Sequence, residues 1–379
     1  MRDYLGFKFK LRPTSEQRQK LAHFAGCSRF VWNRAMTIMK NELDKTNRCM
    51  GYQKMAGKLR DWKNEEPTSF LRSAHSQSLQ ATLRDLDKAY LDAFQKKRNF
   101  PRFKTKENDS FRYPQGIKME NNQVFLPKIG WVKFVKSRDI EGDLNYTTVS
   151  FECGHWYVSF NTELECESHK HPGGEVGIDL GVRKFATLSN GEIYESPRPF
   201  EKYLEKLAVE QRKLSLKEKG SNRYEKQKNR VLRIYRKIVN VRKDFLHKTS
   251  TAICKKNAFI GIEDLDVSNM SRSRKSIGKN SKFYAKRKSS KFNRSILDQG
   301  WFEFRKILEY KSRRYGASLV AVPPQYTSME CRKCGCCDRK NRKKQELFKC
   351  IQCDHLENAD LNASHIILRD AKEIFKKIF

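Results

Sequence analysis

Residues Val176-Gly177-Ile178-Asp179-Leu180-Gly181 form a short apolar run that carries one acid near its end and stops at a glycine. A continuous apolar run of this length is typical of a buried strand. Burying a charged carboxylate is costly unless a partner holds its charge. Taken alone, the hexapeptide favours a solvated Asp179 in a strand-turn. The alternative is that Asp179 is a ligand of a metal ion, and the rest of the chain decides between the two.

The chain is long enough for two or three domains and is strongly basic. Its 379 residues include 79 Lys and Arg against 44 Asp and Glu, which gives a formal net charge of +35. Such a charge indicates a polyanionic partner, either nucleic acid or an anionic membrane. No apolar run approaches the ~20 residues of a membrane-spanning helix. The first residues do not resemble a secretory signal. We therefore expect nucleic-acid partners and no membrane.

The first 170 residues combine a β pattern with a helical block. Residues 4–11 alternate apolar and basic side chains, which predicts a half-buried strand. Helical spacing then runs through residues 14–98, where Thr14 and Gln17 have capping-box spacing. Within that block we expect helices over 51–62 and 68–98. Short strands of a small barrel or sandwich follow, at 123–126, 131–134, 147–151 and 156–161. Because the first strand has no partner nearby, we expect it to pair with these, which makes the helical block an insertion into a β domain.

From Glu175 onward the pattern becomes α/β, after a linker at 169–174. Residues 266–295 are poor in apolar side chains and rich in Ser, Lys, Arg and Asn, which predicts a mobile basic loop. The other expected elements are strands at 176–180, 184–188, 258–265 and 318–322, and helices at 200–257 with a break at Gly220-Ser221, at 296–315 and from about 361 to 379.

Six of the eleven cysteines lie between Cys331 and Cys353. Two Cys-x-x-Cys pairs, at 331/334 and 350/353, have the spacing of a zinc ribbon, in which four thiolates surround one structural zinc ion. Cys336, Cys337 and His355 are close enough in sequence to compete as ligands. The pattern therefore predicts a closed zinc site that serves folding or nucleic-acid docking.

Two further acids occupy positions comparable to that of Asp179. Glu263 follows a buried strand, and Asp360 opens the last helix, where an acid is also favoured by the helix dipole. Each acid alone can be explained without a metal ion, Glu263 as a strand-end acid that faces water and Asp360 as an acid at a helix N-terminus. Together, three carboxylates at element ends of one α/β domain are what two Mg²⁺ ions require for in-line attack of water on a phosphodiester.

The order of these motifs resembles the TnpB family, transposon-encoded RNA-guided DNA endonucleases related to type V CRISPR effectors. The similar segments cover nearly the whole chain: 7–13, 29–33, 100–103, 126–131, 178–181, 240–248, 262–264, 300–301, 326–328, the cysteine pairs and 358–364. The resemblance implies an α/β multidomain fold. Its parts are a wedge β-barrel (1–13 and 99–170), a helical recognition insert (14–98), a RuvC/RNase H-like nuclease domain (175–325 and 355–379) and a zinc ribbon (326–354).

The resemblance also implies roles for individual residues. Asp179, Glu263 and Asp360 would be the catalytic carboxylates on two Mg²⁺ ions, and Cys331, Cys334, Cys350 and Cys353 the ligands of one structural Zn²⁺. Residues 266–295 look like the segment that gates the active site. Tyr52 and Gln80 match positions that read the target-adjacent motif, although Ser76 stands where a Lys is found in relatives. The expected partners are a guide RNA and target double-stranded DNA, with one protein monomer per guide, in the cytoplasm and nucleoid of a prokaryote.

The chain departs from the family pattern near the last cysteine. Asp354 replaces a Gly after that cysteine, and Glu357-Asn358-Ala359 replaces an acid–Arg pair before Asp360. Neither change removes a carboxylate of the triad, which favours cleavage. The alternatives are an RNA-guided DNA-binding protein or transposition accessory factor without cleavage, and a transposase that joins strands, for which no Tyr or Ser recombinase pattern is evident.

Overall fold

The computed structural model describes residues 2–47, 49–106, 109–165, 171, 173–271, 290–342 and 344–378. The chain divides into two compact units, Met1–Cys166 and Glu167–Phe379. Most of the linker expected at 169–174 and the middle of the basic loop expected at 266–295 lie outside the described residues. No helix among the described residues is long and apolar enough to cross a membrane.

Unit 1 is built on a seven-stranded antiparallel sheet with the order β2-β6-β7-β1-β5-β4-β3. The first strand of the chain lies between β7 and β5, as its lack of a near partner predicted. The ladder ends at β2 and β3, so the described strands form an open order rather than the closed barrel that was one expectation. The strands are β1 (Arg2–Arg12), β2 (Ser110–Tyr113), β3 (Lys118–Glu120), β4 (Gln123–Leu126), β5 (Gly130–Val135), β6 (Asp143–Glu152) and β7 (His155–Glu165).

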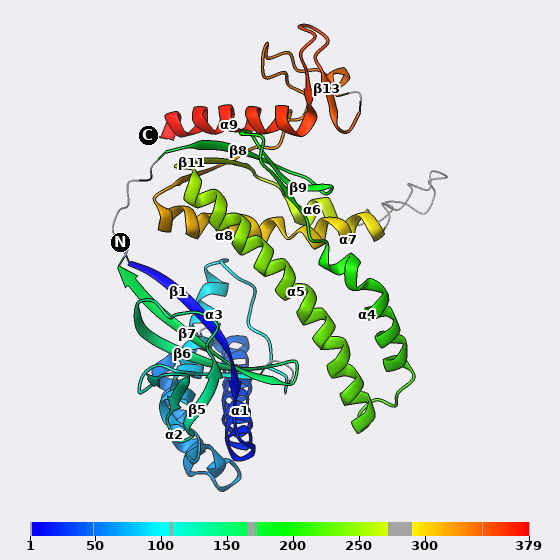
Figure 1. Cartoon of the computed structure of the whole chain (residues 1–379). Coiled ribbons are helices and arrows are strands. Elements are labelled where there is room, and N and C mark those ends of the chain that lie inside the picture. The colour runs from blue at the N-terminus through cyan, green and yellow to red at the C-terminus, as the bar shows by residue number, and fades with distance from the viewer. Residues whose placement is uncertain are drawn as a thin grey trace. The chain divides into compact units, whose positions relative to one another are not determined.

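Three α-helices share one apolar core with this sheet: α1 (Ser15–Thr46), α2 (Tyr52–Asn64) and α3 (Ser76–Phe94) (Figure 1). Thr14 and Gln17 form the predicted capping box at the start of α1. The prediction of a single helix over 68–98 is wrong. A 3-10 helix, η1 (Glu66–Arg72), comes first, and α3 begins only at Ser76 because His75 is extended.

Unit 2 is a three-layer α/β structure around a five-stranded sheet of order β10-β9-β8-β11-β12. Strands β8, β11 and β12 are parallel, whereas β9 and β10 are antiparallel to their neighbours. One face packs against α5 and α8, and the other against α9 (Figure 1). The strands are β8 (Glu175–Leu180), β9 (Lys184–Leu188), β10 (Ile193–Glu195), β11 (Phe259–Glu263) and β12 (Ser318–Val322).

The helices of unit 2 follow the predicted order with shifted boundaries. The helix expected from 296 begins earlier and is divided at Gly300, whose φ of 72° is left-handed. The loop expected at 266–295 contains a short helix at its start and the beginning of another at its end. These helices are α4 (Pro199–Ser215), α5 (Asn222–Lys256), α6 (Val267–Ser271), α7 (Ser290–Gln299), α8 (Trp301–Tyr315) and α9 (Ala359–Ile378).

The cysteine-rich segment (the cysteine module, 326–358) contains two Cys-x-x-Cys knuckles, and the second of them lies at the turn of a hairpin. It contains a short 3-10 helix, η3 (Arg339–Asn341), and the strands β13 (Leu347–Lys349) and β14 (Leu356–Asn358). The hairpin crosses position 354, where the zinc ribbon was expected to end. It leads directly into α9, so the cysteine module and the last helix are covalently continuous.

Candidate functional site

Three carboxylates from distant parts of the sequence meet at one edge of the unit 2 sheet. Asp179 lies on β8 and Glu263 ends the neighbouring parallel strand β11. The pairs Gly177–Gly261 and Ile178–Ile262 fix the register, and one further residue along it places Glu263 beside Asp179. Asp360 is the second residue of α9, which crosses the same strands. The charges of Glu263 and Asp360 both act on Asp179.

Two glycines let α9 approach the strands closely enough to bring Asp360 to this edge. A Cβ on Gly177 would lie 2.0 Å from the backbone oxygen of Ser364 in α9. A Cβ on Gly261 would lie 2.8 Å from the Cβ atom of Ala371. Because these glycines are register partners, they form one slot for the helix. Each precedes its carboxylate by two residues, so the slot and the acids have a fixed relation.

Two of these carboxylates, Asp179 and Glu263, have raised pKa values. Burial raises the pKa of Asp179 well above its usual range, and the negative charges of Glu263 and Asp360 raise it further. Burial also raises the pKa of Glu263, which is 8% exposed. A cluster of like charges with raised pKa values is typical of a functional site. Cations would stabilise it, since they favour the ionised carboxylates.

Two neutralising contacts reach the acids from outside the sheet. The Thr327 hydroxyl donates a hydrogen bond of 2.8 Å to Oε1 of Glu263 and lowers its pKa. The Arg342 guanidinium donates to Oδ1 of Asp360 at 3.1 Å. Arg342 also lowers the pKa of Asp179 and of Glu263. Arg342, which comes from the cysteine module, therefore contributes a positive charge to this acid cluster.

The four predicted zinc ligands are brought together. The sulfurs of Cys331 and Cys353 are 3.6 Å apart, and those of Cys334 and Cys350 are 3.5 Å apart. A tetrahedral zinc with Zn–S bonds near 2.3 Å separates its sulfurs by about 3.8 Å. Within the described residues, these thiols are the one group of three or more metal-ligating side chains whose ligand atoms all lie within 4.8 Å of one another.

One thiol of the cysteine cluster is poised as a thiolate, whereas burial and the neighbouring thiols raise the pKa of Cys331, Cys334 and Cys353. Burial raises the pKa of the Cys350 thiol, but the backbone amides of Cys353 and Gln352 and the neighbouring thiols bring it down to about 6. A thiolate is the form that binds a metal. His355, one of the competing candidates, instead contacts the Glu357 carboxylate at 3.2 Å. Cys336 and Cys337 lie outside the group of four.

Buried asparagines connect the cysteine module to its surroundings. Asn341 is fully buried, donates to the carbonyls of Met329 and Cys336, and accepts from the amide of Ile351. It therefore fixes the turn that carries Arg342. Asn362 of α9, also fully buried, accepts from the Arg332 amide. Through these two side chains the position of Arg342 over Asp360 depends on the cysteine cluster.

The two residues predicted to read an adjacent DNA motif lie in unit 1. Tyr52 is the first residue of α2, and Gln80 lies in the first half of α3. The Arg84 guanidinium, one turn after Gln80, stacks over the Tyr52 ring at 4.9 Å. Because residues four apart share a helix face, Arg84 places Tyr52 and Gln80 on the same surface. Both side chains are half-buried.

Sequence reasoning missed Arg342, Thr327 and the glycine slot. Thr327 lies in a segment, 326–328, that entered only through the family resemblance. Arg342 lies in a basic stretch in which nothing distinguishes it from its neighbours. The glycine pair carried a signal, because both glycines precede an acid by two residues in an apolar run. That spacing was sufficient to pair the strands in register.

Three family models match the chain. A model described as "Probable transposase" matches residues 158–274, which include Asp179 and Glu263. A "Cas12f1-like, TNB domain" matches residues 301–367, which include the four cysteines and Asp360. A "Helix-turn-helix domain" matches residues 1–48, where the structure has β1 and the single long helix α1.

Curated relatives match over nearly the full length. A putative RNA-guided DNA endonuclease, InsQ, of Escherichia coli is 45% identical over 97% of this chain and 92% of its own. A putative RNA-guided DNA endonuclease of Streptomyces pristinaespiralis is 32% identical over 96% of this chain and 88% of its own. The solved structure of the mini-RNA-guided endonuclease CRISPR-Cas_phi3 aligns with 97% of this chain and 92% of its own, at 12% identity and a TM-score of 0.46. With relatives of this similarity and extent, the chain belongs to the TnpB family.

Proposed function

We propose that this protein is an RNA-guided DNA endonuclease that cuts target DNA next to a short adjacent motif. The observation that carries the proposal is the convergence of Asp179, Glu263 and Asp360 at one edge of the unit 2 sheet, with charges that act on one another. Relatives that match over nearly the full length are named as putative RNA-guided DNA endonucleases, and this supports RNA as the guide. The net charge of +35 suits a polyanionic partner of that size.

The three carboxylates would hold two Mg²⁺ ions. Carboxylate oxygens are the ligands that Mg²⁺ prefers, and two ions about 3.5–4 Å apart need ligands spread over a wider area than one ion does. The acids suit this, since they come from three different elements and the charges of Glu263 and Asp360 both act on Asp179. When bound, the ions supply an activated water and charge stabilisation at the scissile phosphate.

The chain's own residues would prepare that site. Thr327 orients the Glu263 carboxylate through its hydrogen bond. Arg342 partly neutralises Asp360 through its ion pair, and its guanidinium would contribute positive charge next to a phosphate held at the carboxylates. The four cysteines would bind one structural Zn²⁺, and Asn341, which donates to the carbonyl of Cys336, would link that site to the turn carrying Arg342.

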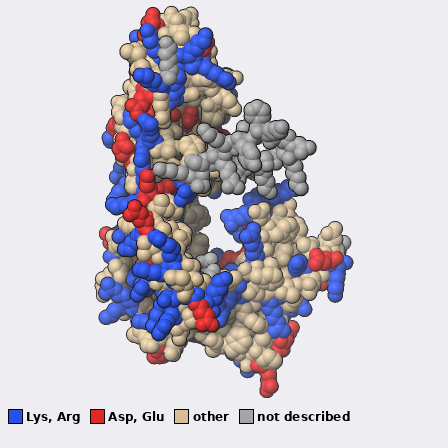
Figure 2. Space-filling model, turned by 90° about the vertical axis from the view of Figure 1, so that its right-hand side faces the viewer, with Lys and Arg blue, Asp and Glu red and all other residues tan. Residues whose placement is uncertain are grey.

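In this proposal unit 2 is the RuvC-like nuclease domain with its zinc ribbon, and unit 1 contains the wedge and the helical recognition insert. Tyr52 and Gln80 on the α2–α3 surface would read the adjacent motif from the duplex. Base pairing with the guide would read the remaining target sequence. Figure 2 shows Lys and Arg side chains distributed over the visible face of the molecule, which suits contacts to phosphates at many points.

The test is reprogramming. The purified protein is combined with its copurified RNA, or with a copy in which only the guide segment is replaced, and given two plasmids with different targets. We expect each RNA to direct Mg²⁺-dependent cutting to its own plasmid, next to the same short motif. Tight binding of both targets without any cutting would instead identify an RNA-guided binding protein. Joined products would identify a strand-transfer enzyme.

A further inference from the structure

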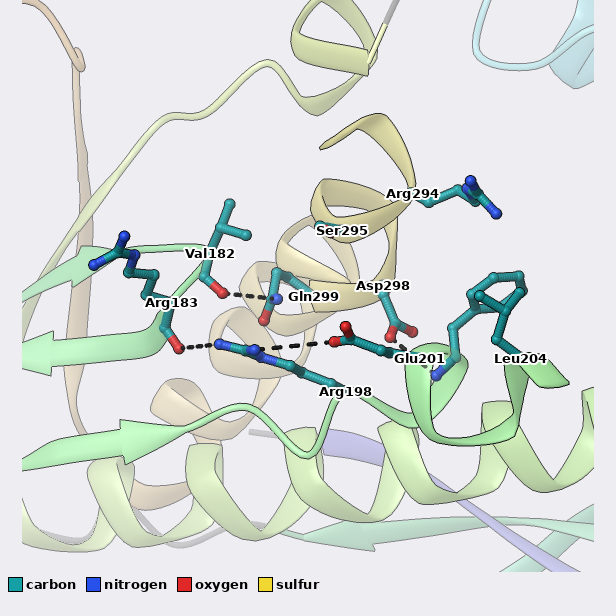
Figure 3. Close-up of a pocket in the computed structure, with 10 residues that line it drawn as sticks. Val182, Arg183, Arg198, Glu201, Leu204, Arg294, Ser295, Asp298 and Gln299 are labelled. Carbon is teal, nitrogen blue, oxygen red and sulfur yellow. Dashed lines mark hydrogen bonds and ion pairs between the residues drawn. The ribbon is translucent and has the colours of Figure 1, made fainter. Parts of the chain in front are cut away.

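A cavity of about 470 Å³ lies in unit 2, and the segment that follows Asp179 in the chain forms part of its lining. One wall is the turn after β8, where Val182 and Arg183 follow Asp179 by three and four residues. The other walls are the first turns of α4 and the end of α7 (Figure 3). Asp179, Glu263 and Asp360 are not among the residues that line this cavity.

The cavity has an apolar interior and basic ends. Val182, Phe200 and Leu204 line it with apolar side chains. Figure 3 shows Arg183 and Arg294 at opposite ends, with their guanidinium groups turned outward from the cavity. An apolar pocket between two outward guanidinium groups suits a nucleobase in the middle and the phosphates on either side of it at the two ends.

The polar groups inside the cavity offer both donors and acceptors. The Arg198 guanidinium donates to the carbonyl of Arg183 at 3.2 Å and faces the Glu201 carboxylate at 3.9 Å (Figure 3). Both side chains are about half exposed, at 49% and 63%. Such an exposed pair contributes only about 0–1 kcal/mol, so separating it is cheap. A base edge carries acceptors and donors side by side. It would accept a hydrogen bond from Arg198 and donate one to Glu201, and so replace their contact with each other.

Gln299, which also lines the cavity, carries an unsatisfied polar atom. Its Nε2 donates to the carbonyl of Val182 at 3.3 Å, which fixes the amide orientation. Its Oε1 is buried without a hydrogen-bond partner, although the residue is only 3% exposed. A buried acceptor without a donor is uncommon and costs free energy. A base amino group entering beside Arg198 would provide the missing donor.

The walls of the cavity are held in place independently of any ligand. The Asp298 carboxylate, 7% exposed, accepts from the amide of Phe200 at 2.9 Å and pairs with Arg242 of α5. This contact caps α4 and ties it to α5 and α7. The pocket is therefore preformed, which lowers the entropic cost of binding.

The cavity connects to the catalytic edge through Arg183. Its side chain pairs with Glu346 of the cysteine module at 3.2 Å, and the carbonyl of Glu346 accepts from the amide of Ala359, the neighbour of Asp360. A strand whose phosphate lies at the carboxylates would thus pass Arg183 on its way to the cavity. The geometry points to a pocket for one unstacked nucleotide of the single-stranded DNA being cut. This inference rests on the proposed function.

The test uses the full chain with Asp179→Ala, assembled with its guide RNA and a target DNA that carries 2-aminopurine at single positions around the cut. This base fluoresces more strongly when it is unstacked. We expect a several-fold increase at one position of the cut strand. Leu204→Trp, which fills the cavity, should abolish the increase. Leu216→Trp at the C-cap of the same helix, at a position 83% exposed and outside the cavity, should retain it.

A second variant protects the test against misfolding. Arg198→Ala removes an exposed side chain and should also reduce the signal, with an unchanged thermal melt. Affinity for single-stranded DNA falls as salt rises, and Arg294→Ala should make the slope of log affinity against log salt less steep by about 0.7. This is the value expected for one lost phosphate contact.

Fluorescence that is the same in Leu204→Trp and Leu216→Trp, or an increase that appears only with the probe in the guide RNA, overturns the inference. Cutting by the chain with Asp179 intact is measured in parallel. An absence of cutting, with the fluorescence response present, contradicts the proposed endonuclease and leaves the pocket standing.

Discussion

Replacing Gly177 with Ala tests the packing that brings the three carboxylates together. The added Cβ would lie 2.0 Å from the Ser364 oxygen, 2.7 Å from the Leu368 nitrogen and 2.9 Å from the Leu368 Cβ. Two of these atoms are backbone, so no side chain can swing aside. Helix α9 must retreat by about 1 Å or more, and overpacking of this kind costs roughly 3 kcal/mol. For a unit of about 200 residues this lowers the melting temperature by about 6–12 °C.

The same retreat moves Asp360 away from Asp179 and Glu263. A displacement of about 1 Å at a catalytic group can reduce the rate roughly 100-fold. Gly261→Ala meets the softer contact with Ala371, at 2.8 Å, and should cost about 1–2 kcal/mol. Gly6→Ala in β1 has no atom within 4 Å of the new Cβ and should remain within about 0.5 kcal/mol of the parent.

Differential scanning calorimetry and a cleavage time course on the three variants measure both effects. The expected order of damage is Gly177, then Gly261, then Gly6. If Gly177→Ala melts and cuts like the parent protein, α9 does not occupy the slot, and the account of how Asp360 reaches the site is wrong.

Three further predictions concern the charges and the metals. Because Asp179 has a raised pKa in the folded chain, its ionisation destabilises the metal-free fold as pH rises above the unfolded value of about 3.9; Asp179→Asn should therefore raise the melting temperature in magnesium-free buffer at pH 8 and have little effect at pH 4. Arg342→Gln should increase the affinity for Mn²⁺ roughly tenfold by electron paramagnetic resonance titration, because a nearby positive charge is removed; Arg339→Gln, exposed in η3, is its control, and equal affinities would contradict the assigned contact with Asp360. Cys350→Ser should lose zinc by elemental analysis and unfold the knuckles, whereas Cys337→Ser should keep it; zinc retained in Cys350→Ser would refute the ligand set.

Local sequence signals predicted most of the elements, and they singled out the three acids that the structure brings together, whose catalytic role stays a prediction. The capping box of Thr14 and Gln17, the break between α4 and α5 at Gly220 and the strands of unit 2 each depend on a few neighbouring residues. The acids could be found because a carboxylate in an apolar run is unusual. The cysteines could be found because their spacing is specific.

Tertiary contacts account for what the sequence did not reveal. The division at Gly300 depends on a left-handed backbone packed against Arg242, and glycine inside a helical pattern does not by itself show that conformation. The short strands β2 and β13 were missed because pairing partners, rather than intrinsic preference, stabilise segments of this length. Arg342 is one arginine among many, and only the fold of the cysteine module places it over Asp360.

The most direct test of the central claim compares cutting by the Asp179→Ala protein with cutting by the parent at equal guide-RNA occupancy. The control is Asp244→Ala, which removes an exposed acid of α5 whose salt bridge is to Lys248 one turn away. We expect Asp179→Ala to bind the RNA and the target like the parent and to cut neither strand in Mg²⁺, while Asp244→Ala cuts normally. Mg²⁺-dependent cutting that persists in Asp179→Ala would contradict the assignment of this carboxylate to the catalytic site.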